Sequence, residues 1–138
     1  MALIAGHSLV AGGAQGRALV LEQPISFWGG VDPGTARITL SGHPQCGQSI
    51  SGQVLVIPRL IGSSSSSSVM LELLHAGRAP AAVLLGERDA ILCLGAIVAR
   101  EMEWPSIPIV EVDISGIRSG DSIDVRVDGM VKVDSHDR

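Results

Sequence analysis

Short apolar runs bounded by glycine and proline recur along the whole chain and limit it to a fold rich in short strands. Two other segments carry apolar residues at helical spacing. One covers 69–75, begins within the preceding serines and closes at Gly77, and the other covers 90–102 with Asp89 as N-cap. The predicted strands cover residues 18–21, 36–40, 53–57, 81–85, 107–112, 122–127 and 130–133.

The order of these elements indicates the fold class. Because strands and helices alternate between residues 53 and 112, parallel pairs joined by crossovers are expected there, while both ends of the chain look all-β. Asp128-Gly129 predicts a hairpin turn near the end, and 135–138 reads as a frayed tail. The sequence therefore predicts an α/β fold with mixed sheets and two main helices.

Composition limits the size and the surface of this fold. A chain of 138 residues is long enough for one substantial core, so a single domain over 1–138 is expected. Its only aromatic residues are Phe27, Trp28 and Trp104, so the core must consist of Val, Ile, Leu and Ala. Charged residues make up 17% and the mean hydropathy is +0.37, which predicts an apolar surface that meets a partner.

Charge and hydropathy patterning exclude several classes of protein. A net charge of −4 without any Lys or Arg cluster argues against a nucleic-acid binder. No apolar run approaches the roughly 18 residues of a membrane span, and the N-terminus lacks the pattern of a signal peptide. A cytoplasmic location is expected.

The potential metal ligands are few and scattered. Cys46 and Cys93 are too few and too far apart for a zinc or iron–sulfur motif, so two free thiols are expected, with Cys93 in the core. The histidines share no metal-ligand spacing and are expected to be structural or solvated; they are His7, His43, His75 and His136. The sequence predicts no metal site within this chain.

Six serines, Ser63 to Ser68, follow Gly62 between a predicted strand and a predicted helix. A serine run is often a flexible linker, but a linker joins complete units, and here no second core follows. At a strand-to-helix turn, small hydroxylated residues leave N–H groups free, cap the helix and admit an anionic ligand to its N-terminus. We therefore expect an ordered turn, with a hydroxyl available for chemistry and with Ser66 and Ser67 as helix caps.

The segment Ser26-Phe-Trp-Gly-Gly-Val-Asp-Pro33 holds two of the three aromatic residues. Its paired glycines permit close backbone approach, so the loop could present N–H groups and Asp32 to a ligand. Alternatively, it is a tight turn with Phe27 and Trp28 packed in the core. If it forms a site, we expect it to lie on the same edge of the domain as Ser63.

Several segments together resemble the small, swivelling subunit of the aconitase X family. They are 25–33, His43-Pro44 with Gly47-Gln48-Ser49, 52–58, Gly62-Ser63-Ser64 and 77–82. Residues 91–96 resemble the bacterial branch of the family more than the archaeal one. The resemblance covers nearly the whole chain.

This resemblance implies a swivelling β/β/α domain that covers an iron–sulfur site carried by a large partner subunit. The cluster would take the leaving hydroxyl of a hydroxy acid substrate, and this chain would be inactive alone. Ser63 matches the serine that acts as catalytic base in these dehydratases. The remaining candidate residues, expected to bind substrate, are Gly62, Ser64, Ser65, Phe27, Trp28, Gly29, Gly30 and Asp32.

Two activities of the family compete. The bacterial character favours dehydration of cis-3-hydroxy-L-proline, and the alternative is dehydration of mevalonate 5-phosphate, which would want more basic residues than Arg59 and Arg78. A third alternative is a non-catalytic regulatory or scaffold module of the same fold. Many members carry Arg or Lys before the glycine, but here Ile61 precedes Gly62, so the cation that binds the substrate carboxylate stays open.

Overall fold

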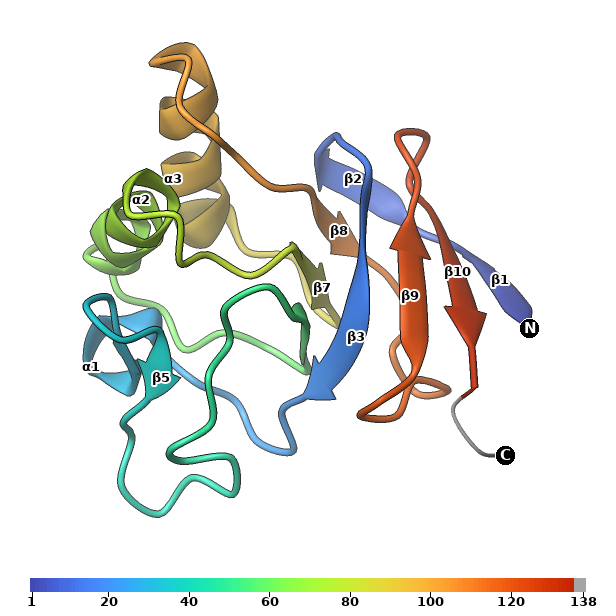
Figure 1. Cartoon of the computed structure of the whole chain (residues 1–138), viewed down its shortest axis with the longest axis horizontal. Helices are drawn as coiled ribbons and strands as arrows, with labels where there is room; N and C mark the ends of the chain where they lie inside the picture. Colours follow the sequence, from blue (N-terminus) through green and yellow to red (C-terminus); the bar gives the residue numbers. More distant parts are fainter. Residues whose placement is uncertain (136–138) are drawn as a thin grey trace.

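The structure is a computed structural model that describes residues 1–135, so His136 and most of the expected tail lie outside the described residues. Figure 1 shows the helices on one side of a curled sheet. The main strands are β1 (Ala2–Ala5), β2 (His7–Val10), β3 (Ala14–Val20), β6 (Val54–Ile57), β7 (Ala82–Leu85), β8 (Ile109–Glu111), β9 (Ser122–Val125) and β10 (Met130–Asp134). The other elements are α1 (Phe27–Gly30), the hairpin β4 (Val31–Asp32) and β5 (Arg37–Ile38), α2 (Ser66–His75) and α3 (Ala90–Glu101).

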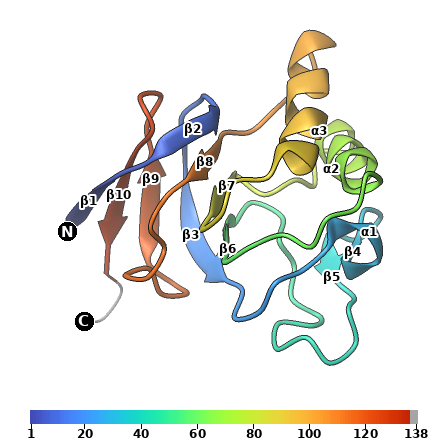
Figure 2. The same cartoon turned by 180° about the vertical axis from the view of Figure 1, so that it is seen from behind.

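The eight main strands form one sheet in the order β1-β10-β9-β3-β6-β7-β8-β2. The pairs β3–β6, β6–β7 and β7–β8 are parallel, and the others are antiparallel. The two end strands, β1 and β2, are consecutive in the chain and separated only by Gly6. The sheet therefore curls until its two edges are bridged by one stretch of chain, as Figures 1 and 2 show from opposite sides.

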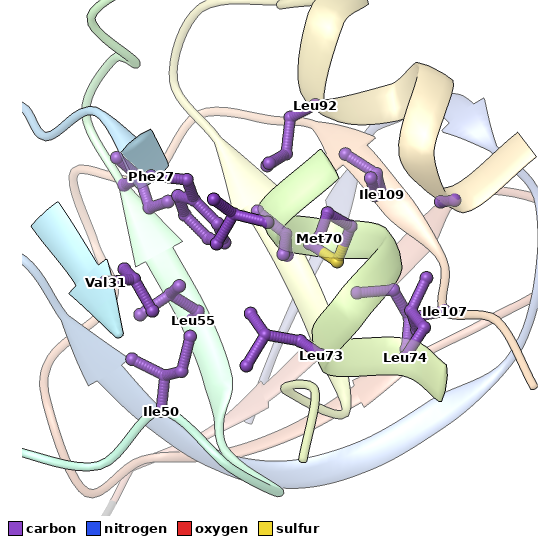
Figure 3. Close-up of a cluster of buried hydrophobic side chains, with 14 of the residues drawn as sticks. Phe27, Val31, Ile50, Leu55, Met70, Leu73, Leu74, Leu92, Ile107 and Ile109 are labelled. Carbon is purple, nitrogen blue, oxygen red and sulfur yellow. The ribbon is translucent and has the colours of Figure 1, made fainter. Parts of the chain in front are cut away.

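The parallel strands are buried on both faces, which explains why their sequences are continuous apolar runs. Along β6, Val54 and Val56 face the interior of the curled sheet, whereas Leu55 and Ile57 face the helices. The interior cluster also includes Leu84, Val110, Ile123, Val125 and Val131. Figure 3 shows the second cluster, in which sheet residues such as Leu55 and Ile109 meet Met70, Leu73 and Leu74 of α2 and Leu92 of α3.

Helices α2 and α3 begin where the sequence predicted. The Asp89 carboxylate accepts a hydrogen bond of 2.8 Å from the Leu92 N–H and so caps α3. The helices pack closely because α3 has a glycine at the contact: a Cβ on Gly95 would stand 2.5 Å from the Ser67 carbonyl oxygen. No helix within residues 1–135 is long and apolar enough to cross a bilayer.

The predicted α/β class with a mixed sheet is confirmed, although several strands differ from their predicted bounds. β3 begins at Ala14 and not at residue 18, and β5 is limited to Arg37–Ile38. Strands β1 and β2 were not predicted. The strand predicted over 122–127 ends at Val125, because 126–129 form the hairpin turn in which the Gly129 N–H donates to the Arg126 oxygen. Val127, the last residue of the predicted strand, is 69% exposed.

The two cysteines are free thiols in different surroundings. Cys46 is exposed, whereas Cys93 is 5% exposed on α3. Burial, together with the nearby negative charge of Asp89, raises the pKa of the Cys93 thiol from 9.0 to about 11. The buried thiol therefore stays protonated at neutral pH.

We expect Cys93 to resist alkylation and to make the fold sensitive to alkali. A group whose pKa is raised by folding stabilises the fold below its unfolded pKa, and this contribution is lost as pH rises from about 9 to about 11. In the native protein at pH 7.5, iodoacetamide should modify Cys46 alone, as read by intact-mass spectrometry. A Cys93→Ala chain should lose less stability between pH 8 and 11 than a Cys46→Ala chain. Equal losses would contradict the assignment.

Candidate functional site

The segment Phe27–Gly30 is a tight turn with one residue inside and one outside. Trp28 (φ −70°, ψ 114°) and Gly29 (φ 80°, ψ −14°) have the backbone angles of a type II turn, which requires glycine at the second of these positions. The Phe27 side chain is fully buried and points into the helix-side cluster in Figure 3. Trp28 is 61% exposed. The alternative in which both rings pack in the core therefore holds for Phe27 and not for Trp28.

The serine run is an ordered turn that becomes a helix. The Ser66 N–H donates to the Ser63 carbonyl at 3.0 Å, and α2 begins at Ser66, as the sequence predicted. The N–H groups of Ser63, Ser64 and Ser65 donate to no acceptor within residues 1–135. The half-buried Ser63 hydroxyl has no partner among those residues either. These groups and the positive end of α2 favour negative charge at this turn.

The aromatic turn and the serine turn lie side by side, as expected. The Ser66 hydroxyl oxygen accepts a hydrogen bond of 3.3 Å from the backbone N–H of Trp28. Just before the two turns, the backbone N–H of Ile61 donates a hydrogen bond of 2.9 Å to the Ile25 carbonyl oxygen. Figures 1 and 2 both show α1 next to α2.

The serine side chains do not cap α2, contrary to expectation. The N-cap residue is Ser65, and its side chain makes no capping hydrogen bond. The Ser67 hydroxyl donates to the Ser64 carbonyl at 3.0 Å. Ser66 is turned inward and is 5% exposed, so its oxygen is used in the contact with Trp28.

A cavity of about 430 Å³ lies between the aromatic turn and the first two turns of α2. Its volume would suit a small ligand. Its acidic residues are Asp32 and Glu72, and none of its lining residues is Lys, Arg or His. One oxygen of the Asp32 carboxylate accepts a 2.8 Å hydrogen bond from the Gly34 N–H, which orients this side chain. The remaining lining residues are Trp28, Gly29, Val31, Pro33, Thr39, Ser68 and Val69.

The structure brings together most of the predicted site residues. Gly62, Ser63, Ser64 and Ser65 form the turn before α2, and Trp28, Gly29 and Asp32 line the adjacent cavity. Phe27 and Gly30 were also expected to bind substrate, but in this structure both are buried beneath the surface of the turn.

Sequence reasoning missed three polar residues of this region. Ser68 and Glu72 are one helical turn apart and line the cavity, and their i, i+4 spacing was a signal that could have been used. The role of Ser66 left no such signal, because its partner is 38 positions away.

His43 and His75 have structural surroundings. His43 is buried; its Nδ1 accepts from the Gln45 N–H at 3.1 Å, and its Nε2 lies 3.2 Å from the Gln23 carbonyl. His75 stacks on Trp104 with ring centroids 4.3 Å apart. In the part of the chain that the structure describes, no three His, Cys, Asp or Glu side chains are placed to share a metal ion.

Known proteins are similar to this chain in sequence and in fold. The cis-3-hydroxy-L-proline dehydratase of Pseudomonas aeruginosa is 51% identical over 107 residues, which cover 78% of this chain but 18% of that protein. The phosphomevalonate dehydratase small subunit of Thermococcus onnurineus is 40% identical over 131 residues, which cover 94% of this chain and 96% of the subunit. This chain thus spans about a fifth of the first relative.

Comparison of structures and of family patterns agrees with these similarities. A chain in the crystal structure of holo aconitase X from Thermococcus kodakaraensis superposes with a TM-score of 0.89 at 36% identity, covering 98% of this chain and 100% of that one. The model of the aconitase X swivel domain matches residues 3–133. The resemblance read from the aromatic and serine segments is confirmed, and the chain belongs to the aconitase X swivel domain family.

Proposed function

We propose that residues 1–138 act as the swivelling small subunit of an iron–sulfur hydro-lyase that dehydrates cis-3-hydroxy-L-proline, with Ser63 as the proton acceptor. The observation that carries this proposal is the serine turn: a hydroxyl without a partner within residues 1–135 stands beside three N–H groups without acceptors there. Membership of the aconitase X swivel domain family supports a lyase role.

The proposed role of the turn is to make a weak base effective. A serine hydroxyl holds its proton tightly in water, so it accepts a substrate proton only where negative charge on Oγ is stabilised. Free N–H donors and the positive end of α2 supply such stabilisation without reorganisation during the reaction. In the elimination, the C–H bond breaks and its proton passes to the Ser63 alkoxide. The electron pair of that bond forms the new carbon–carbon double bond, while hydroxide leaves from the neighbouring carbon.

Within residues 1–135, no cluster of metal-ligating side chains is placed to receive the hydroxide. Cys46 is exposed on a loop and Cys93 is buried in α3, so these two thiols do not fit an iron–sulfur cluster. In this proposal the cluster therefore belongs to a large partner subunit, and the site is completed where the two meet.

The character of the cavity favours the imino acid over a phosphate. Its lining has two carboxylates beside an exposed indole and no basic residue, which suits a protonated ring amine and repels a phosphate. The higher identity to the Pseudomonas dehydratase points the same way. Mevalonate 5-phosphate is the second candidate, because the Thermococcus small subunit is matched over 96% of its length.

The test is reconstitution with a cluster-bearing partner purified anaerobically. Co-expression of this chain with the large subunit of an aconitase X enzyme should yield a complex that converts cis-3-hydroxy-L-proline to the cyclic imine. The product is followed by mass spectrometry after borohydride reduction. Each subunit alone should be inactive. Turnover of mevalonate 5-phosphate alone would select the second candidate, and a stable chain that captures no cluster-bearing protein would favour a non-catalytic module.

A further inference from the structure

Ser66 differs from the other five serines of the run. It is 5% exposed, whereas its neighbours are half-buried or exposed. Its hydroxyl oxygen accepts the hydrogen bond from the Trp28 N–H, which joins positions 38 residues apart. Within residues 1–135, this is the one side-chain hydrogen bond between the serine run and the aromatic turn.

This hydrogen bond holds the backbone from which the Trp28 side chain projects. Trp28 is 61% exposed, and its indole N–H has no partner within the described chain, so backbone contacts determine where the ring stands. The next residue, Gly29, has a φ of 80° and would have no neighbour within 4 Å even as alanine, so it offers the turn no support from packing. Phe27 anchors one end of the turn in the core, and the Ser66 oxygen anchors its middle.

The Ser66 hydroxyl lies next to both parts of the candidate site, the serine turn and the cavity beside Trp28. Ser66 is the first residue of α2 and its N–H donates to the Ser63 carbonyl, so a shift of Ser66 moves the serine turn. Trp28 forms a wall of the 430 Å³ cavity. A single hydroxyl thus links the position of the indole to that of the proposed proton acceptor.

We propose that Ser66 is a positioning residue: its buried hydroxyl holds the Trp28 turn against the serine turn and so fixes the indole beside the substrate cavity. The kinetic part of this proposal rests on the function proposed above, whereas the link between Ser66 and Trp28 mobility does not. Ser66→Ala replaces the hydroxyl group by a hydrogen atom. The backbone N–H of Trp28 then has no acceptor, and the turn is free to move.

Trp28 mobility can be measured in the full chain without a partner. In a Trp104→Phe background Trp28 is the one tryptophan, so its time-resolved fluorescence anisotropy reports the motion of this ring alone. Ser66→Ala should add a fast, large-amplitude decay, and Ser66→Thr, which keeps the hydroxyl, should restore the slow decay. The matched control is Ser67→Ala, which should leave the decay unchanged because Ser67 bonds only to the Ser64 carbonyl.

Kinetics of the reconstituted complex provide the second measurement. Ser66→Ala should lower kcat/KM for cis-3-hydroxy-L-proline by about tenfold, mainly through KM, because the indole no longer stands at one wall of the site. Ser66→Thr should recover most of the loss. Unchanged anisotropy in Ser66→Ala, or equal losses in Ser66→Thr and Ser66→Ala, would overturn the proposal.

The outcomes separate this inference from the proposed function. If the wild-type complex does not dehydrate cis-3-hydroxy-L-proline, the proposed function fails and the anisotropy alone decides whether Ser66 holds Trp28. If Ser66→Ala does not fold, Ser66→Cys takes its place, since sulfur fills the same pocket but accepts hydrogen bonds weakly. Normal kinetics with a mobile Trp28 would contradict the kinetic part.

Discussion

Ser63→Ala should reduce turnover of cis-3-hydroxy-L-proline by the reconstituted complex by about 10² to 10⁴-fold, the usual contribution of a positioned general base. The substitution removes the proton acceptor, while the free N–H groups of the turn and the start of α2 remain in place. The hydroxyl is half-buried and has no partner within residues 1–135, so little packing is lost. Initial rates under anaerobic conditions measure the effect.

Two controls make this result specific. Ser67→Ala removes another hydroxyl of the same run and should leave turnover within about twofold of wild type, as expected of a residue outside the site. Affinity of the Ser63→Ala chain for the large subunit, measured by calorimetry, should match that of the wild type. Near-normal turnover in the Ser63→Ala complex would show that Ser63 has no part in the mechanism.

Phe27→Ala should lower the free energy of unfolding by about 3–5 kcal/mol, the usual cost of deleting a buried phenyl ring. Phe27 is the one phenylalanine of the chain and is fully buried among the residues that join α2 to the sheet. Urea denaturation followed by circular dichroism gives the difference.

The neighbouring aromatic residue provides the control for this experiment. Trp28→Ala removes a larger ring that is 61% exposed, so the free energy of unfolding should fall by less than about 1 kcal/mol. Activity of the complex should show the reverse order, because Trp28 lines the cavity and the Phe27 ring does not. Comparable destabilisation by both substitutions would contradict the inside and outside assignment of the two rings.

Local patterns in the sequence were sufficient for the central part of the fold. The apolar runs of β6 and β7, the N-cap of α3 at Asp89 and the start of α2 within the serines were all predicted. Each depends on neighbours within one or two helical turns or on a strand buried on both faces, so the signal is local. The family likewise followed from short segments whose combination is specific.

Strands β1 and β2 could not be predicted because their stability comes from distant partners. β1 pairs with β10, more than 120 positions away, and β2 pairs with β8. Neither has a clear apolar alternation: Leu3 is 51% exposed, and Ser8 and Leu9 are both half-buried. Curling of the sheet, which brings the two edges to one stretch of chain, creates these pairings.

The sequence by itself determined which segments form the candidate site: the aromatic turn and the serine run, joined by their resemblance to one family. Only the tertiary structure decided how each residue is used. The type II turn places Phe27 in the core and Trp28 at the surface. In the first turn of α2, the Ser66 side chain points inward, so its hydroxyl contacts Trp28 and does not cap the helix. These choices depend on packing between segments about 38 positions apart, and no pattern within either segment records that packing.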